Sequence, residues 1–279
     1  MTLTLALIST LYAFAEDPER LPTPARVAPL RTVVFIHGLY LNAGCWDGWR
    51  EVFEAEGYAT LAPEWPGHEG EPAALRADIP DALNTLSFEQ LVAQHRELVA
   101  GLDSPILIGH SMGGLIVQLL LQEGLGRAGV VLHSAPPKGL TSFAPAFLRS
   151  NAPVLKPGMD PILLSPKQFH FGFANSLDRD AALAVYEASL VPEAKGVAKG
   201  PLTDAAELDW AKERAPLLIV AGAEDHVIPA GLNERMARRY EASPSRTDLV
   251  VMPGRTHGTL TQPGWEQVAG DVLAWLAAL

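Results

Sequence analysis

The chain has 279 residues, 48% of them hydrophobic, so it can form one large or two ordinary domains around a sizeable core. Its 21 basic and 32 acidic side chains give a formal charge of -11 without any lysine or arginine run, which argues against nucleic acid as a partner. Cys45 is the single cysteine, which excludes an intrachain disulfide, and we interpret it as a small packing residue.

The first 30 residues carry an apolar run followed by a proline-rich linker. Residues 3–15 resemble the hydrophobic part of a signal peptide, and Ala13-Phe14-Ala15 resembles its cleavage site, but the basic start of such a peptide is missing. The run is too short to span a bilayer, so we expect no stable membrane insertion. We predict that residues 1–30 are a retained N-terminal extension of a cytoplasmic protein. The alternative is secretion, if residues 1–15 act as a signal peptide.

Six short apolar runs are typical of buried strands in a parallel sheet. They lie at residues 32–36, 59–62, 105–108, 130–133, 216–221 and 247–252. Helix-like stretches alternate with these runs, such as residues 44–56, 88–102 and 115–122. This alternation predicts an α/β fold with a mostly parallel, doubly wound sheet, in which ligands bind at the carboxyl ends of the strands.

Residues 136–208 interrupt the alternation and divide the predicted core into residues 31–135 and 209–279. The interruption is rich in Pro, Phe and Leu, and its segments FAPAFLRS and QFHFGFANSL are typical of short amphipathic helices. Because it precedes the last two predicted strands, we interpret it as a helical lid over a site at the edge of the sheet. The alternative is a helical side layer of the core, since aromatic spacing usually reflects packing.

The stretch ILIGHSMGGLIVQLL, residues 106–120, places one serine between glycines at a predicted strand-to-helix junction. In the pattern G-x-S-x-G, Gly109 and Gly113 remove side chains that would collide in a sharp turn, and Ser111 is presented as a nucleophile. The free N–H groups at the start of the helix favour negative charge at that position. A simple tight turn is the alternative, because glycine is common where a strand reverses.

A serine hydroxyl needs a base, and the base needs an acid that orients it. Among eight histidines, His257 is the best candidate, because it follows the last predicted strand in a loop bounded by glycines. Asp225 is the candidate acid, because it follows the strand at 216–221 and the chain order Ser111, Asp225, His257 suits this chemistry. Glu224 is the rival acid, and a helix N-cap is the alternative role for Asp225.

The oxyanion of acyl transfer needs preorganised N–H donors. His37 and Gly38 end the first strand, so the backbone N–H of Leu39 can join that of Met112, although a plain strand-ending turn is the alternative. GLGRAG, residues 124–129, formally matches a dinucleotide fingerprint, but it follows a predicted helix and precedes a strand, which favours a helix C-cap and turn. We see no metal motif and expect neither a metal nor a cofactor.

With these motifs, residues 31–279 resemble the α/β-hydrolase superfamily, in particular its lid-bearing serine hydrolases of the esterase and lipase type. The H-G-x oxyanion loop and the G-H-S-M-G-G elbow carry the resemblance. It implies the nucleophile Ser111, the base His257, the orienting acid Asp225 and the oxyanion donors Leu39 and Met112. The serine nucleophile argues against the haloalkane dehalogenase and epoxide hydrolase branches, and the hairpin often found ahead of the first parallel strand is not readable in residues 1–30.

We therefore expect a cofactor-free hydrolase that forms an acyl-enzyme on Ser111 from a small, mainly apolar ester or related acyl substrate. It would act as a monomer or homodimer. The candidate substrate-binding side chains are Trp46, Phe143, Phe169 and Phe173. A lactonase, a thioesterase or a carbon–carbon bond hydrolase could use the same residues, and a ligand-binding protein of low turnover is the alternative outside enzymes.

Overall fold

The computed structural model describes residues 31–158 and 160–279, and Arg31–Leu279 form one compact unit. The predicted N-terminal extension, with its signal-like run and its linker, lies outside the described residues. Within the described ranges, no helix is both long enough and apolar enough to cross a membrane.

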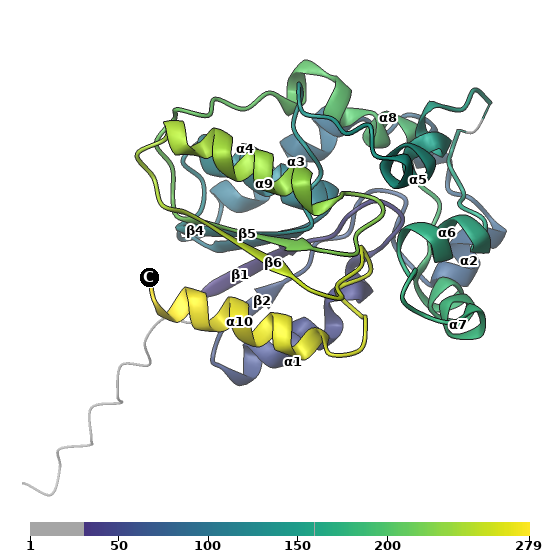
Figure 1. The fold of residues 1–279 in the computed structure, drawn as a ribbon, viewed down its shortest axis with the longest axis horizontal. Helices are drawn as coiled ribbons and strands as arrows, with labels where there is room; N and C mark the ends of the chain where they lie inside the picture. Colours follow the sequence, from purple (N-terminus) through teal and green to yellow (C-terminus); the bar gives the residue numbers. More distant parts are fainter. Residues whose placement is uncertain (1–30, 159) are drawn as a thin grey trace, which may run out of the picture. The chain divides into compact units, whose positions relative to one another are not determined.

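One parallel sheet of six strands forms the centre of the part that the structure describes (Figure 1). The order across the sheet is β2-β1-β3-β4-β5-β6, and each neighbouring pair is parallel. The strands are β1 Thr32–Ile36, β2 Ala59–Leu61, β3 Ile106–His110, β4 Ala128–Leu132, β5 Leu217–Gly222 and β6 Thr247–Met252. All six predicted runs are strands, with ends that differ from the prediction by at most two residues, so the predicted α/β sheet is confirmed.

Helices cover both faces of this sheet. The helices of the core are α1 Asp47–Ala55, α3 Phe88–Ala100, α4 Met112–Gln122, α9 Ala230–Arg239 and α10 Trp265–Ala277. Helix α2 Pro72–Ala77 does not cover the sheet and packs against α7 Arg179–Ser189 instead. In β1, Val34 and Ile36 pack with α3 and α4, whereas Val33 and Phe35 pack with α1 and α10. Figure 1 shows α3 and α4 on one side of the sheet and α1 and α10 on the other. Because successive strand residues point to opposite faces, a sheet covered on both sides needs apolar residues at consecutive positions. This explains why the central strands are continuous apolar runs.

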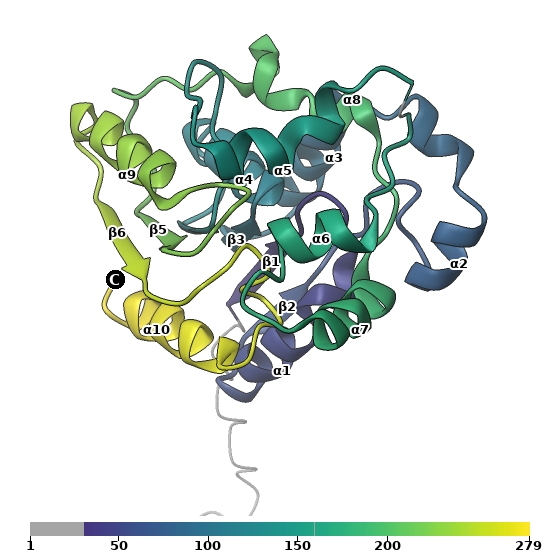
Figure 2. The ribbon, with the colours of Figure 1, turned by 45° about the vertical axis from the view of Figure 1, so that its right-hand side comes forward.

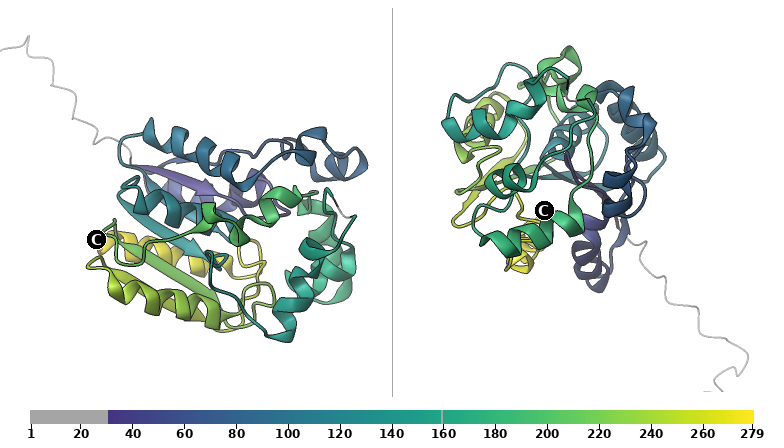
Figure 3. Two further views of the ribbon diagram at one scale, coloured as in Figure 1. Left: turned by 90° about the horizontal axis from the view of Figure 1, so that it is seen from above. Right: turned by 90° about the vertical axis from the view of Figure 1, so that its right-hand side faces the viewer.

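Between β4 and β5 the chain leaves the sheet and forms further helices. In the described part of this segment they are α5 Pro145–Leu155, α6 Pro166–Gly172, α7 Arg179–Ser189 and α8 Lys195–Ala198. Apolar side chains such as Ile162, Phe169 and Leu190 give the segment a hydrophobic cluster of its own. Figures 1 and 2 show α5, α6 and α7 beyond the carboxyl ends of the strands, and the right-hand view of Figure 3 looks onto this side. The predicted helical insertion is present, while its role as a lid stays a prediction.

Capping side chains explain where two of the helices begin. The Ser87 hydroxyl accepts the N–H of Gln90 at the start of α3 and the Gln90 side chain accepts the N–H of Ser87, and Ser165 with Gln168 repeats this at α6. Helix α4 differs, because Ser111 precedes it without a side-chain capping bond, so its first N–H groups stay open. The described residues also contain short 3₁₀ helices at Ala43–Trp46, Asp81–Asn84, Gly200–Leu202, Asp204–Ala206 and Tyr240–Ala242.

Candidate active site

Ser111 stands at the junction of β3 and α4 with a φ angle of +52°. This backbone region costs a residue with a Cβ roughly 1–3 kcal/mol, and such strain gathers at functional sites. The turn leaves the side chain 5% exposed, beside the open N–H groups at the start of α4. Negative charge that forms at Ser111 would be stabilised by those groups.

The glycines around Ser111 are required by close backbone contacts. A Cβ on Gly113 would lie 2.1 Å from the carbonyl oxygen of Ile36, and a Cβ on Gly109 would lie 2.3 Å from the carbonyl oxygen of Gly113. A Cβ on Gly38 would lie 2.7 Å from the Cβ of Ser111. Real Cβ atoms do not approach other atoms so closely, so only glycine fits these positions. The structure thus has the close backbone contacts that the G-x-S-x-G pattern predicts, and a side chain at Gly109 or Gly113 would collide there.

Three side chains from three strand ends form one hydrogen-bonded series. The Ser111 hydroxyl donates to Nε2 of His257 at 3.0 Å, and Nδ1–H of His257 donates to Oδ2 of Asp225 at 2.8 Å. Ser111 follows β3, Asp225 follows β5 and His257 follows β6. Because all strands are parallel, these ends meet at one edge of the sheet. The structure thus brings together the three residues that the sequence singled out.

The Asp225 carboxylate accepts four hydrogen bonds. Oδ1 accepts the backbone N–H groups of Val227 and Ile228, both at 2.8 Å, and Oδ2 accepts Nδ1–H of His257 and of His133, also at 2.8 Å. Burial by itself raises the pKa of Asp225, but the neighbouring His257 and the hydrogen bonds from His133 and His257 hold it well below its usual range. The carboxylate is therefore ionised at neutral pH and fixed in direction.

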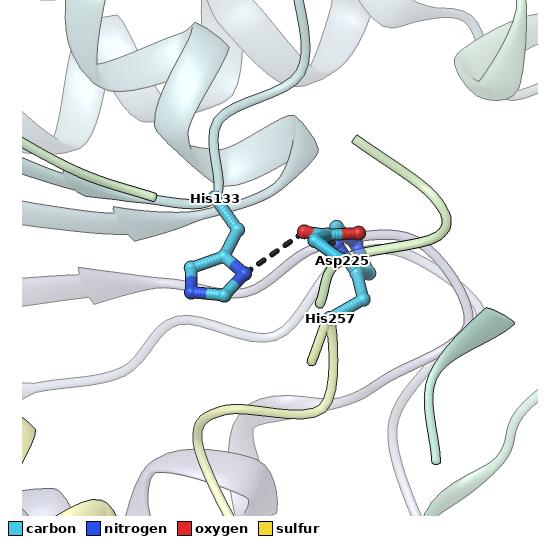
Figure 4. Close-up of side chains that lie close together, drawn as sticks. All are labelled: His133, Asp225 and His257. Carbon is cyan, nitrogen blue, oxygen red and sulfur yellow. Dashed lines mark hydrogen bonds and ion pairs between the residues drawn. The ribbon is translucent and has the colours of Figure 1, made fainter. Parts of the chain in front are cut away.

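His133 is a member of the site that the sequence analysis missed. It follows β4, the neighbour of β5 in the sheet, and its imidazole points at the Asp225 carboxylate (Figure 4). The sequence held one signal, a polar residue directly after a buried central strand, but several histidines share that feature. Only the pairing of β4 with β5 shows that this histidine lies next to Asp225.

His133, Asp225 and His257 also have the composition of a metal site, since their ligand atoms lie within 4.8 Å of one another. The contacts argue otherwise. Both imidazoles direct Nδ1 at the same carboxylate oxygen at hydrogen-bond distance, and the second carboxylate oxygen is taken by backbone N–H groups. Each of these atoms has a hydrogen-bond partner, so the arrangement fits a carboxylate held in one orientation better than it fits a metal-binding site.

Leu39 and Met112 line the same cavity as Ser111. The cavity has a volume of about 200 Å³, and most of its remaining lining is apolar. Met112 is the first residue of α4, so helix geometry leaves its N–H without a partner in the helix. Leu39 lies in the turn after β1, as the oxyanion prediction requires. The two predicted oxyanion donors are thus neighbours of the nucleophile.

Two hydrogen bonds with residues of the helical insertion hold the turn that carries Leu39. The backbone N–H of Tyr40 donates to Oε2 of Glu193 at 3.0 Å, and the carbonyl of Tyr40 accepts the N–H of Val191 at 3.0 Å. Tyr40 has a φ angle of +66°, so these two bonds hold a strained residue. Glu193 is a second residue that the sequence analysis missed, because no motif marks a lone glutamate in an insertion.

Glu193 is fully buried and its charge has local partners. Oε1 accepts the backbone N–H of Ala194 at 2.8 Å, and Oε2 lies 3.4 Å from Nε2 of His68. Burial lowers the pKa of His68, but the Glu193 carboxylate outweighs this and raises it above the ordinary value. These contacts hold the Glu193 carboxylate in the position where it accepts the N–H of Tyr40.

Two of the four predicted substrate contacts, Trp46 and Phe143, line neither cavity near the candidate triad. Trp46 has no exposed surface and packs against Phe35 and Trp49 in the core, so a substrate cannot reach it. Phe143 is 83% exposed, because it precedes α5 in a segment that packs against little. Phe169 and Phe173 stack on each other and line a smaller cavity of about 40 Å³, which His257 also lines.

The rival acid and two neighbouring features lie outside this hydrogen-bonded series. Glu224 is exposed, next to Asp225 in the chain but turned to solvent. His110 donates from Nε2 to the backbone carbonyl of His257 at 2.9 Å, so it supports the loop of His257. Residues 124–127 form the turn between α4 and β4, and residues 128 and 129 begin β4, which agrees with the C-cap interpretation and not with a dinucleotide site.

The chain matches the Alpha/beta hydrolase family over residues 33–270. A similar solved structure is a monoacylglycerol lipase from Paleococcus ferrophilus, with 22% identity, a TM-score of 0.63, and 88% of this chain and 94% of that chain covered. A pyrethroid hydrolase from Sphingobium faniae JZ-2 has 16% identity, a TM-score of 0.61, and coverage of 89% and 98%. A methylesterase from Arabidopsis has 17% identity, a TM-score of 0.64, and coverage of 90% and 100%. At these identities the likeness to the solved structures shows the fold.

Proposed function

The chain belongs to the alpha/beta hydrolase family, and on this premise we propose that it is a serine hydrolase that cleaves a carboxylic ester of a small, mainly apolar substrate. The observation that carries the proposal is the hydrogen-bonded series from Ser111 through His257 to Asp225. The names of the similar structures, a lipase, a methylesterase and a pyrethroid hydrolase, support the same reaction class.

In the proposed mechanism, Oγ of Ser111 attacks the ester carbonyl carbon while its proton passes to Nε2 of His257. The tetrahedral intermediate collapses, the alcohol leaves with that proton, and the acyl group stays on Ser111. A water molecule then attacks the acyl-enzyme and gives a proton to His257, which returns it to Ser111 as the acid leaves. Asp225 stays ionised and holds Nδ1–H of His257, which keeps Nε2 free to accept protons.

We propose the backbone N–H groups of Leu39 and Met112 as the donors to the oxyanion. Their support is the shared cavity with Ser111 and the position of Met112 at the start of α4. Such donors are worth on the order of 3 kcal/mol each in the transition state. Because the turn and the helix are fixed before substrate arrives, little reorganisation opposes the reaction.

The cavity beside Ser111 supports an apolar acyl or alcohol group. Apart from Ser111 itself, the polar side chains of its lining are Thr141 and Asn151, while Leu148 and Val154 represent its apolar walls. Helix α5 supplies part of the lining, so the insertion at residues 136–208 would control access. We retain the lid interpretation of this insertion as part of the proposal.

A fluorophosphonate probe tests the proposal, because it reacts covalently with activated serines. Intact-mass measurement and peptide mapping should find one adduct, on Ser111, in the wild-type protein. Ser111→Ala should give none, and His257→Ala should react far more slowly, because the base is missing. With a panel of esters, thioesters and lactones, Ser111→Ala should lose on the order of 10⁴-fold in kcat for the preferred class.

The panel separates ester hydrolysis from the related reactions that the same residues could perform. A preference for thioesters or lactones would keep the nucleophile and change the substrate class. A folded wild-type protein that forms no adduct on Ser111, or a Ser111→Ala variant that keeps near wild-type turnover, would overturn the proposed mechanism.

A further inference from the structure

We propose that His133 is a positioning residue of the candidate active site, which holds the Asp225 carboxylate by the oxygen that His257 also uses. The inference rests on the proposed serine hydrolase mechanism and adds a fourth side chain to it. His133 follows β4, which lies between the strand that leads to Ser111 and the strand that leads to Asp225. From there it can act through Asp225 without contact to substrate.

Both imidazoles meet at one carboxylate oxygen. Nδ1 of His133 and Nδ1 of His257 each lie 2.8 Å from Oδ2 of Asp225, and the two ring centroids are 6.1 Å apart at an interplanar angle of 63°. Figure 4 shows the His133 ring directed at the carboxylate, from the end of a different strand. Without His133, His257 would be the remaining donor to Oδ2, and the carboxylate would rotate more easily.

The backbone is shaped to place this ring. His133 has a φ angle of +50°, in the left-handed region that residues other than glycine rarely adopt. A Cβ on Gly222 would lie 2.3 Å from Cε1 of His133, so the glycine at the end of β5 leaves the space that the ring fills. A strained residue and a matching glycine on the next strand indicate a specific position for this imidazole, beyond the filling of a core.

The surroundings assign the proton of His133 to Nδ1. The ring is fully buried, and its Nε2 has no hydrogen-bond partner among residues 31–158 and 160–279. Burial lowers the pKa of His133 below its ordinary value, and the bond to Asp225 offsets this in part, so the ring is neutral at pH 7 and its one N–H faces the carboxylate. The charged and titratable groups that face it are Asp225, His257, His110 and Arg255.

The second donor has a consequence for the base. A hydrogen bond from His133 draws part of the negative charge on Oδ2 away from His257. If the bond is removed, that charge stabilises the imidazolium form of His257 more strongly, so the base loses its proton only at higher pH. The acidic limb of the kcat/KM profile should then move to higher pH.

The test compares His133→Leu, which removes the donor at similar size, with His133→Asn, whose amide N–H lies near the position of Nδ1. His133→Leu should lower kcat roughly tenfold to a hundredfold with a much smaller change in KM, because a hydrogen bond to a charged group is lost. It should also move the acidic limb to higher pH, and His133→Asn should restore most of the rate. The matched control is His95→Leu, which removes another buried imidazole, bonded from Nδ1 to the carbonyl of Leu91.

A proton NMR measurement keeps this inference separate from the proposed function. The wild-type protein should show two protected, downfield Nδ1–H resonances, one each for His133 and His257, and this needs no turnover. His133→Leu should lose one of them and displace the other. The inference is overturned if His133→Leu keeps the wild-type rate and pH profile, if it loses activity only as much as His95→Leu with the acidic limb unmoved, or if its NMR signal for His257 is unchanged.

Discussion

The backbone N–H of Tyr40 donates to the Glu193 carboxylate at 3.0 Å, although the two residues are 153 positions apart in the chain. Tyr40 follows Leu39, whose N–H we propose as an oxyanion donor. Glu193 belongs to the insertion, where its backbone forms a bridge with Ile162. The insertion therefore contributes to the walls of the cavity and also holds the turn that carries the proposed oxyanion donor.

Glu193→Ala should lower kcat roughly tenfold or more, with a smaller effect on KM, because Tyr40 loses its acceptor and the Leu39 N–H moves away from the oxyanion. Glu193→Gln keeps an oxygen within reach of Tyr40 and should retain more activity. Steady-state kinetics on a good ester substrate measure kcat and KM, and thermal unfolding shows whether both variants are folded. An alanine variant with full kcat would show that the turn holds its shape without Glu193.

Gly113→Ala should destabilise the protein by roughly 3 kcal/mol or more, because the new Cβ would overlap the carbonyl oxygen of Ile36. For a unit of this size, Tm should fall by about 6–12 °C. The control is Gly270→Ala in α10, where the new Cβ would have no atom within 4 Å and the helix should gain about 0.5–1 kcal/mol. Differential scanning calorimetry checks both, and equal effects of the two substitutions would contradict the steric argument.

The free energy of unfolding should fall as the pH drops below about 6.5. Burial lowers the pKa values of His37, His95, His110 and His133, so these rings stay neutral in the folded protein while the unfolded chain takes up protons. Each contributes a loss of up to about 1.4 kcal/mol per pH unit. His68 opposes the trend, because Glu193 raises its pKa against the effect of burial.

Urea unfolding at several pH values between about pH 7.5 and about pH 5 measures the slope of the free energy of unfolding against pH. His95→Leu should make the slope shallower by the share of one histidine, since leucine does not titrate. A wild-type stability that stays constant over this range would contradict the burial of neutral imidazoles.

Leu148→Trp should reduce kcat/KM for long acyl chains about tenfold more than for acetyl esters, because the larger side chain fills part of the cavity beside Ser111. Leu148 lies on α5 and is 52% exposed, so the substitution does not crowd the core. Leu183→Trp on α7 is the matched control, at 37% exposure and outside the cavity lining. A series of p-nitrophenyl esters measures, for each variant, the ratio of kcat/KM for long acyl chains to kcat/KM for the acetyl ester. Identical chain-length profiles for the two variants would place the acyl group elsewhere.

Much of the fold was predictable because the sheet is buried on both faces. Such a sheet needs consecutive apolar residues, so residues 32–36 could be identified as a strand with the bounds that the structure has. The alternation with helices then predicts parallel strands, and parallel strands place their carboxyl ends together. Ser111, Asp225 and His257 each follow a strand, so their meeting could be predicted from chain order.

The aromatic residues could not be placed in this way. Trp46 and Phe143 both lie just before a helix, yet one is fully buried and the other is 83% exposed. Whether an aromatic ring faces a core, a cavity or solvent depends on which elements pack around it. That packing involves residues distant in the chain, so hydrophobic pattern alone does not determine it.

The sequence by itself determined the α/β class, the strand-to-helix turn at Ser111 and the candidate acid and base, because local apolar patterns and glycine positions decide secondary structure. Only the tertiary structure decided that His133 shares the Asp225 carboxylate and that Glu193 holds Tyr40. These contacts join residues 92 and 153 positions apart. They depend on which strands are neighbours and on how the insertion folds back, and no local pattern in a single chain encodes either.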